Sequence, residues 1–336
     1  MSQTEGRAVI EVTDLVKIFG SDTRAVDGIT FSVAPGELFG FLGPNGAGKT
    51  TTIRILATLL NATSGTARVA GFEVAAEPQQ VRKALGLAMQ TPTLDAFSTG
   101  RETLELSGRL HRMPGPERRK RADELLELMN LTSVAKKLTG TYSGGMKRRL
   151  DLAAALMHRP KALILDEPTE GLDPQSRTAL WEELERISGL GTTMLLTTHY
   201  MEEADRLCSR LAIIDNGKIV VEGSPEELKR SMGADTVVLQ LDGTGGDDRD
   251  GQVKQIQERL GDLVAADSVK SHPAGVSLAV TNSSTAIPEL LRRLDGDGVH
   301  ITGLQMTQPS LDDVFLKHTG RRIRAEAADQ PIMMGW

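Results

Sequence analysis

The residues best suited to chemistry lie together at positions 43–50. Their sequence, Gly-Pro-Asn-Gly-Ala-Gly-Lys-Thr, matches the pattern G-x-x-x-x-G-K-[ST]. The glycines let successive backbone amides curl around a phosphate, Lys49 brings a positive charge to the β- and γ-phosphates, and Thr50 offers a hydroxyl ligand to Mg²⁺. The segment therefore predicts a site for a nucleoside triphosphate with Mg²⁺. The expected phosphate-binding residues are Gly43, Pro44, Asn45, Gly46, Ala47, Gly48, Lys49, Thr50 and Thr51.

Two adjacent acids close a later apolar run. Asp166 and Glu167 follow residues 162–165, which are all apolar. Beside a phosphate-binding loop, Asp166 can hold Mg²⁺ and Glu167 can take a proton from the attacking water. Adjacent acids that merely end a strand are common, but their order after the loop favours the chemical role.

A second anion site is indicated by Ser143-Gly144-Gly145. Ser143 is a good N-cap for a helix running to about His158, before Pro160. Two glycines at a helix start expose amide groups, and the N-terminal end of a helix favours an anion. A plain helix cap is the alternative explanation of this motif.

Four further residues lie at positions from which they can contribute to a nucleotide site. Phe19, upstream of the loop, can stack on a nucleobase or belong to the core, and the two readings are evenly balanced. Gln90 ends an apolar strand and can assist Mg²⁺ or the attacking water. Asp173 caps a helix that starts at Pro174, and that cap can be its whole role. His199 ends a strand, at the edge where parallel α/β sheets bind ligands.

Strands and helices alternate around these residues. Apolar runs at 38–42, 85–90, 162–166 and 192–198 predict strands, and apolar residues recur at helical spacing after Lys49. Residues 95–158 are predicted to be mostly helical. The alternation predicts an α/β fold with the chemical residues at the strand ends.

Composition excludes several functional classes. At 336 residues the chain is long enough for two domains, and its net charge of −6 gives no basic field for nucleic acid. No apolar stretch approaches the length of a membrane span, and residues 1–7 carry no secretory signal. The single cysteine, Cys208, excludes an internal disulfide and fits a reducing compartment.

A separate pattern begins beyond residue 233. Strands are predicted at 236–241, 267–272, 275–282 and 301–308, with helices at 251–263 and 286–294. The resulting order β-α-β-β-α-β is typical of a small α+β ferredoxin-like domain. We therefore place domains at 1–232 and 233–320, followed by a disordered tail at 321–336.

The order of these motifs resembles the ATP-binding cassette (ABC) family over residues 8–230. The resemblance implies a P-loop NTPase domain with a RecA-like core and a helical subdomain at about 91–158. It implies that Phe19 stacks on adenine, Gln90 and His199 assist hydrolysis, and Asp173 lies at the dimer interface. Ser143, Gly144 and Gly145 would clamp the γ-phosphate held by a second copy. The family's usual residues are replaced by Phe19, Tyr142 and Met146, and none of these changes removes a charge from the site.

The C-terminal pattern resembles one branch of that family. Residues 309–316, Pro-Ser-Leu-Asp-Asp-Val-Phe-Leu, and residues 141–146, Thr-Tyr-Ser-Gly-Gly-Met, are similar to the ATP-binding subunits of daunorubicin/doxorubicin-resistance exporters. The resemblance implies a homodimeric ATPase on the cytoplasmic face of the cell membrane. It would power export of a hydrophobic drug through a permease on a separate chain.

Three other assignments remain open at this point. The chain could serve a lipid or glycolipid exporter, because the branch includes both. A soluble ABC ATPase of DNA repair or translation usually carries two cassettes or a long coiled coil, and this sequence has one loop and no long heptad run. A P-loop GTPase or small-molecule kinase would lack the Ser-Gly-Gly helix.

Overall fold

The computed structural model describes residues 8–233, 235–241, 249–260, 264, 269–272, 274–280, 283–296 and 301–321. They form two compact units. The first contains the described residues up to Pro225 together with Arg321, and the second is Glu226–Gly320. The two units divide at 225/226, one short helix before the expected boundary at 232/233. The difference arises because α8 (Pro225–Arg230) falls almost wholly in the second unit. The expected tail at 321–336 lies outside the described residues except for Arg321.

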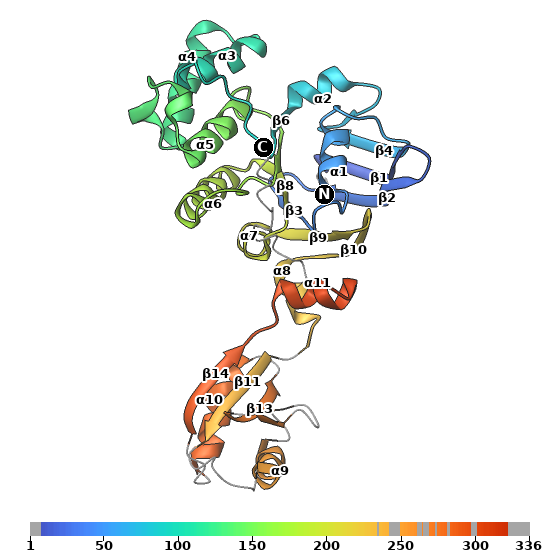
Figure 1. The fold of residues 1–336 in the computed structure, drawn as a ribbon, viewed down its shortest axis with the longest axis vertical. Coiled ribbons are helices and arrows are strands. Elements are labelled where there is room, and N and C mark those ends of the chain that lie inside the picture. The colour runs from blue at the N-terminus through green and yellow to red at the C-terminus, as the bar shows by residue number, and fades with distance from the viewer. Residues whose placement is uncertain are drawn as a thin grey trace, which may run out of the picture. The chain divides into compact units, whose positions relative to one another are not determined.

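A six-stranded sheet forms the centre of the first unit, in the order β10-β9-β3-β8-β7-β6 (Figure 1). Neighbouring strands are parallel, except that β10 runs antiparallel to β9. Every side chain of β3, β7 and β8 is buried, as expected for parallel strands covered on both faces. The strands are β3 (Leu38–Leu42), β6 (Leu85–Ala88), β7 (Ala162–Asp166), β8 (Thr193–Thr198), β9 (Arg210–Asp215) and β10 (Lys218–Gly223).

A second, antiparallel sheet packs against one side of the first. Its order is β2-β1-β4-β5, and its strands are β1 (Ile10–Phe19), β2 (Thr23–Val33), β4 (Ser64–Val69) and β5 (Phe72–Glu73). The core between the sheets includes Phe31, Phe39 and Phe41, with ring centroids 4.7 Å apart for the pair Phe31–Phe41. Burial of each ring contributes about 1.5–3 kcal/mol. This core fixes the strand that leads into the phosphate-binding loop.

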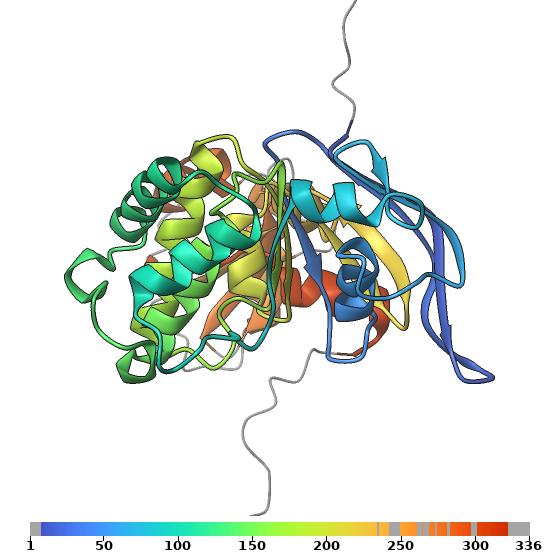
Figure 2. The ribbon, with the colours of Figure 1, turned by 90° about the horizontal axis from the view of Figure 1, so that it is seen from above.

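Helices complete the first unit. In Figures 1 and 2 the helices α3, α4 and α5 lie on the opposite side of the central sheet from β1, β2 and β4. They form the predicted helical subdomain. The bounds are α1 (Lys49–Leu56), α2 (Pro78–Ala84), α3 (Gly100–Leu110), α4 (Gly115–Leu128), α5 (Gly144–Ala155), α6 (Pro174–Gly189) and α7 (Met201–Leu207), with 3₁₀ turns at Thr132–Val134 and Thr139–Thr141.

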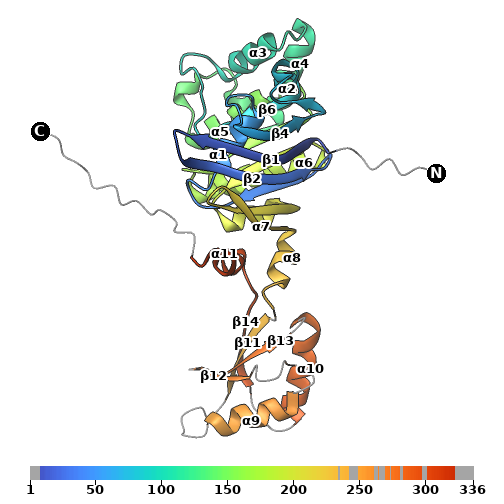
Figure 3. The ribbon, with the colours of Figure 1, turned by 90° about the vertical axis from the view of Figure 1, so that its right-hand side faces the viewer.

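The second unit confirms the ferredoxin-like prediction. Its sheet has the order β12-β13-β11-β14 with every neighbour antiparallel, and α9 and α10 lie along one face (Figure 3). The elements are β11 (Asp235–Leu241), α9 (Arg249–Leu260), β12 (Lys270–His272), β13 (Gly275–Val280), α10 (Ser283–Gly296), β14 (Ile301–Thr307) and α11 (Leu311–Thr319). The strand expected at 267–272 begins at Lys270: Val269 lies just before it, and positions 267 and 268 lie outside the described residues.

Two features of the fold bear on later experiments. No helix among the described residues is long and apolar enough to span a membrane. Cys208 ends α7 and is buried against β3, where a Cβ on Gly40 would lie 2.5 Å from the cysteine sulfur. Burial raises the pKa of this thiol. Gly40 is therefore needed for close packing, and the thiol is a structural one.

Candidate active site

The phosphate-binding loop connects β3 to α1, as the sequence predicts. Gly46 and Gly48 have φ values of 81° and 107°, in the left-handed region that favours glycine. Gly43 serves a different need, because a Cβ there would lie 2.3 Å from the carbonyl oxygen of Ile214 in β9. The amide of Gly217 also donates to the carbonyl of Ala47 at 3.0 Å. Neighbouring strands therefore hold the loop in its curled form.

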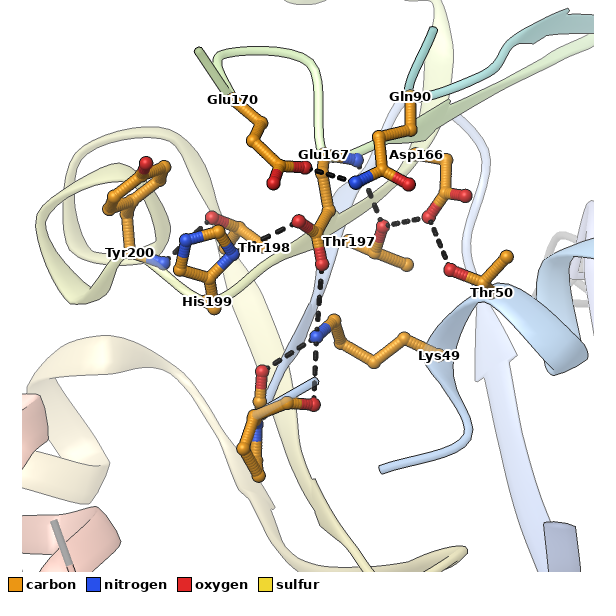
Figure 4. Close-up of polar contacts among 12 residues, drawn as sticks. Lys49, Thr50, Gln90, Asp166, Glu167, Glu170, Thr197, Thr198, His199 and Tyr200 are labelled. Atoms are coloured by element: carbon orange, nitrogen blue, oxygen red, sulfur yellow. Dashed lines mark hydrogen bonds and ion pairs between the residues drawn. The ribbon is translucent and has the colours of Figure 1, made fainter. Parts of the chain in front are cut away.

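Lys49 is folded back over its own loop (Figure 4). Its side chain is 3% exposed, and its Nζ donates to the carbonyl oxygens of Gly43 at 2.7 Å and Pro44 at 3.1 Å. The same Nζ lies 3.1 Å from Oε1 of Glu167. The ammonium is thus positioned by the loop and neutralised by the acid expected to act as base.

Asp166 lies beside Thr50 at the end of β7. Its Oδ1 accepts hydrogen bonds from the hydroxyls of Thr50 at 3.2 Å and Thr197 at 2.6 Å. Its Oδ2 is buried and has no hydrogen-bond partner among the described residues. A buried, unpaired carboxylate oxygen next to a hydroxyl is costly in water-free surroundings and fits a hard cation such as Mg²⁺. The donor set therefore suits the metal that the sequence predicts.

Glu167 adopts a strained backbone. Its φ is 45°, which costs about 1–3 kcal/mol for a residue with a side chain. Its amide donates to both the carbonyl and the hydroxyl oxygen of Thr197, each at 3.1 Å. These bonds come from the register of β7 and β8, in which Asp166 pairs with Thr197. In this backbone conformation the carboxylate faces Lys49 and His199.

The Glu167 carboxylate is held in its charged form. Burial acts to raise its pKa, but the hydrogen bond from His199 and the charge of Lys49 outweigh burial and hold the pKa at about 2. His199 Nδ1 lies 3.0 Å from Oε2, so the two carboxylate oxygens face different partners (Figure 4). The structure brings Lys49, from the start of α1, together with Glu167 and His199, which follow β7 and β8.

Gln90 makes a contact that the sequence does not predict. Its amide donates to the carboxylate of Glu170, rather than bonding to Thr50 or Asp166. Burial and the adjacent Glu167 raise the pKa of Glu170. An acid three residues after Glu167 was the available signal in the sequence.

Ser143, Gly144 and Asp173 lie apart from this cluster. The Ser143 hydroxyl accepts from the amide of Met146 at 3.2 Å, and Asp173 Oδ1 accepts from the amide of Ser176 at 3.0 Å. Ser143 and Gly144 are exposed, and among the described residues the hydrogen bonds of Ser143 and Asp173 stay within their own helix ends. One chain therefore leaves the amides at the start of α5 facing outward.

Gly145 is buried, unlike the other residues of this motif. A Cβ there would lie 2.9 Å from Oγ of Ser176 and 3.0 Å from its Cβ. Exposure of an amide to an anion therefore does not by itself explain the glycine at position 145. Gly145 lets the first turn of α5 pack against the first turn of α6.

Phe19 ends β1, and the residue is 43% exposed. The ammonium of Lys17 lies 5.1 Å from the ring centroid. A residue with this exposure is not part of the hydrophobic core. It leaves the ring available for stacking on a base.

Comparisons with known proteins agree with this geometry. Family models match the ABC transporter domain over residues 26–170 and the C-terminal domain of DrrA1-3-like ATP-binding proteins over residues 223–319. The daunorubicin resistance ATP-binding protein DrrA2 of Streptomyces coeruleorubidus is 44% identical over 302 residues, covering 90% of this chain and 92% of that protein.

Solved structures extend the comparison to the fold. An ATP-binding subunit of an ABC transporter has a TM-score of 0.61 and 30% identity, covering 67% of this chain and 93% of that one. The dimeric ATP-binding cassette MJ0796, bound to ADP and Pi, has a TM-score of 0.58 and 25% identity, covering 64% of this chain and 98% of that one. These relatives do not favour a GTPase, a kinase or a soluble non-transport ATPase. The chain belongs to the ABC transporter family, as an ATP-hydrolysing subunit of the daunorubicin-resistance branch.

Proposed function

We propose that this ATPase powers export of a hydrophobic drug or antibiotic through a membrane permease on a separate chain. The observation that carries the catalytic part is the cluster of Lys49, Asp166, Glu167 and His199 at one edge of the central sheet. The choice of cargo follows the relative named for daunorubicin resistance. A lipid or glycolipid cargo has no observation of its own in this chain.

Binding of ATP would rearrange the lysine first. The γ-phosphate offers Lys49 a stronger partner than the two loop carbonyls, because both groups are charged. Moving the ammonium toward the phosphate removes one of the groups that hold the pKa of Glu167 low. Glu167 would then be a better base for the attacking water, while the His199 bond keeps its carboxylate oriented.

Mg²⁺, when bound, would neutralise charge on the β- and γ-phosphate oxygens. Thr50 and the unpaired Oδ2 of Asp166 are the residues that would hold it. Gln90 would join them only after leaving Glu170. Thr197 keeps Asp166 oriented through its 2.6 Å bond.

The site is completed, in this proposal, by a second copy of the chain. Ser143 and Gly144 are exposed at the start of α5, whose N-terminal amides favour a phosphate. Within one chain Ser143 has no hydrogen bond to the phosphate-binding loop among the described residues. A homodimer would bring the Ser143 of each copy to the ATP of the other, and Asp173 would lie at the same interface.

Complementation between two inactive variants tests the shared site. A Lys49→Ala chain and a Ser143→Arg chain, mixed and confirmed as heterodimers by mass, should regain single-turnover hydrolysis at one sound site. No recovery in confirmed heterodimers would contradict it, and a linked dimer with one lesion would then show whether both sites must be sound.

A pull-down tests the transport part of the proposal. Tagged protein should recover a multispanning permease from membranes, as expected of a subunit bound at their cytoplasmic face. Recovery of nucleic acid or ribosomes instead would oppose the assignment.

A further inference from the structure

Arg148, on α5, is a buried arginine whose side chain donates only to backbone carbonyls among the residues that the structure describes. Its side chain is 4% exposed. Its Nε donates to the carbonyl of Pro168 at 2.7 Å, its Nη2 to that of Asp166 at 3.0 Å, and its Nη1 to that of Met89. The carboxylate of Asp151, 3.5 Å from Nη1, supplies a counter-charge one turn along the same helix.

The three carbonyls belong to the two segments that carry hydrolysis. Asp166 and Pro168 flank Glu167, the residue with the left-handed backbone. Met89 precedes Gln90, whose amide is held by Glu170. A strained segment keeps its conformation only where its surroundings over-determine it. The amide of Glu167 donates to Thr197. Arg148 binds the carbonyl of that same peptide group, which belongs to Asp166, and the carbonyl of Pro168, one residue beyond Glu167.

The guanidinium is the group that this arrangement requires. It is planar and presents donors in a fixed fork, so it can serve three carbonyls lying in different directions. Lysine keeps the charge but concentrates its donors on one atom, and its ammonium cannot span the same three oxygens. Substitution by lysine therefore removes the bridge while retaining the buried charge.

We propose that Arg148 is a positioning residue for hydrolysis at its own chain's phosphate-binding loop. It anchors α5 to the backbone around Glu167 and to the strand end before Gln90. The same helix starts at Ser143, which the shared site assigns to the partner's ATP. Arg148 thereby links the chain's own hydrolytic segments to the helix that carries Ser143. Only the assignment of Ser143 to the partner's ATP rests on the proposed function.

The chain offers a matched control in an arginine of α4 that contacts the other end of α5. Arg121 donates to the carbonyl of Leu156, the residue that caps α5, at 3.2 Å, and it pairs with Glu124. It is also largely buried and bonded to backbone, but these bonds do not involve the Glu167 or Gln90 segments. Arg121→Lys should lower stability without touching the catalytic loop.

The first experiment compares Arg148→Lys with Arg121→Lys in the full chain, in the form that hydrolyses ATP. Arg148→Lys should lower kcat about tenfold or more, as expected when a reacting group is misplaced, while the affinity for a fluorescent ATP analogue stays unchanged. Hydrogen exchange should rise at 166–170 in Arg148→Lys and not in Arg121→Lys. Equal kcat in both variants, or equal exchange at 166–170, would overturn the proposal.

The second experiment places the lesion relative to a single working site. In one heterodimer, Arg148→Lys is paired with a Lys49→Ala partner, so the altered chain supplies its own loop and Glu167. In the other, one chain carries both Arg148→Lys and Lys49→Ala, and its partner is wild type. The altered chain then supplies only Ser143 to the working site. The reference pairs wild type with Lys49→Ala. We expect the rate to fall in the first heterodimer and to stay near the reference in the second.

Each result of this comparison decides the point. A fall only in the second heterodimer would mean that Arg148 acts through Ser143, and equal falls would mean a general loss of structure; both overturn the proposal. If the reference itself is inactive because the sites work only together, the kcat and exchange comparison of the first experiment decides. Failure of the Lys49→Ala and Ser143→Arg complementation would refute the shared site while leaving that comparison intact.

Discussion

The ammonium of Lys49 lies 3.1 Å from Oε1 of Glu167, so the cation expected to bind phosphate is paired with the carboxylate expected to accept a proton. Both side chains are buried, and neither charge is free while the pair persists. ATP binding and activation of the base are therefore expected to be one event.

The stability effects of Lys49 and Glu167 should be strongly coupled. Lys49→Ala should destabilise the protein, because it removes the ammonium that neutralises the buried carboxylate of Glu167. Glu167→Gln should offset part of that loss in the double variant, giving a coupling energy of about 1–3 kcal/mol in a urea-unfolding cycle. Lys49→Ala should also abolish hydrolysis. Additive effects, within about 0.5 kcal/mol, would show that the pair contributes nothing.

Glu167→Gln should bind ATP and fail to hydrolyse it. The amide keeps the shape of the side chain but cannot take a proton, and it loses a negative charge beside the phosphates. With ATP and Mg²⁺ the variant should run as a stable dimer in size-exclusion chromatography with light scattering. Asp173→Ala in the same background tests the interface. A monomer with bound ATP would contradict the shared site.

Gly145→Ala should disrupt the packing of α5 on α6. The added methyl would lie 2.9–3.0 Å from the side chain of Ser176, so one helix must move. We expect a loss of about 1–3 kcal/mol in unfolding free energy, as for other overpacked contacts. Ser176→Gly removes both clashing atoms and should restore part of the stability in the double variant. No rescue would show that the glycine is needed for another reason.

Stability should fall as pH rises toward neutrality because of Glu183 on α6. Burial raises its pKa to about 7, against the opposing charge of Arg149, which lies 3.6 Å away. Between pH 4.5 and about 7 the folded protein keeps a proton that the unfolded chain has released, so the free energy of unfolding falls with rising pH. The loss should reach up to about 3 kcal/mol and disappear in Glu183→Gln. Identical pH profiles of the two proteins would refute this.

A chain ending at Pro225 should bind ATP as well as the full chain, within about twofold. It keeps the described residues of the first unit except Arg321, and with them every proposed nucleotide ligand. Transport or assembly should be impaired instead. Isothermal titration with ATP and a thermal melt would check this. Loss of ATP affinity in a cooperatively folded truncated protein would show that the second unit contributes to the site.

Local patterns predicted the strands and loops of the site, but contacts between distant segments escaped them. The strand ends that deliver Glu167 and His199 follow from apolar runs. The bond from Thr197 to Asp166 depends on the register of two strands that are far apart in sequence. The same limit hid the contact between Glu170 and Gln90. No periodicity encodes which residues face each other after folding.

One missed element did carry a local signal. Asn216 and Gly217 have φ values of 48° and 78° and join β9 to β10 in a tight hairpin, which Asn-Gly between apolar runs favours. This hairpin matters for the site because Gly217 bonds to the phosphate-binding loop. Lys49 shows the opposite case: the sequence predicts its loop, but no local pattern indicates that its side chain is buried against Glu167.

The packing of Cys208 against Gly40 has a practical consequence for labelling. The chain has one cysteine, whose sulfur is buried and whose pKa is raised. Thiol reagents should therefore not react with it while the protein is folded. A single Ser143→Cys substitution would then carry the only accessible thiol. A fluorophore or spin label there would report the approach of a second copy directly, with no need to remove the native cysteine first.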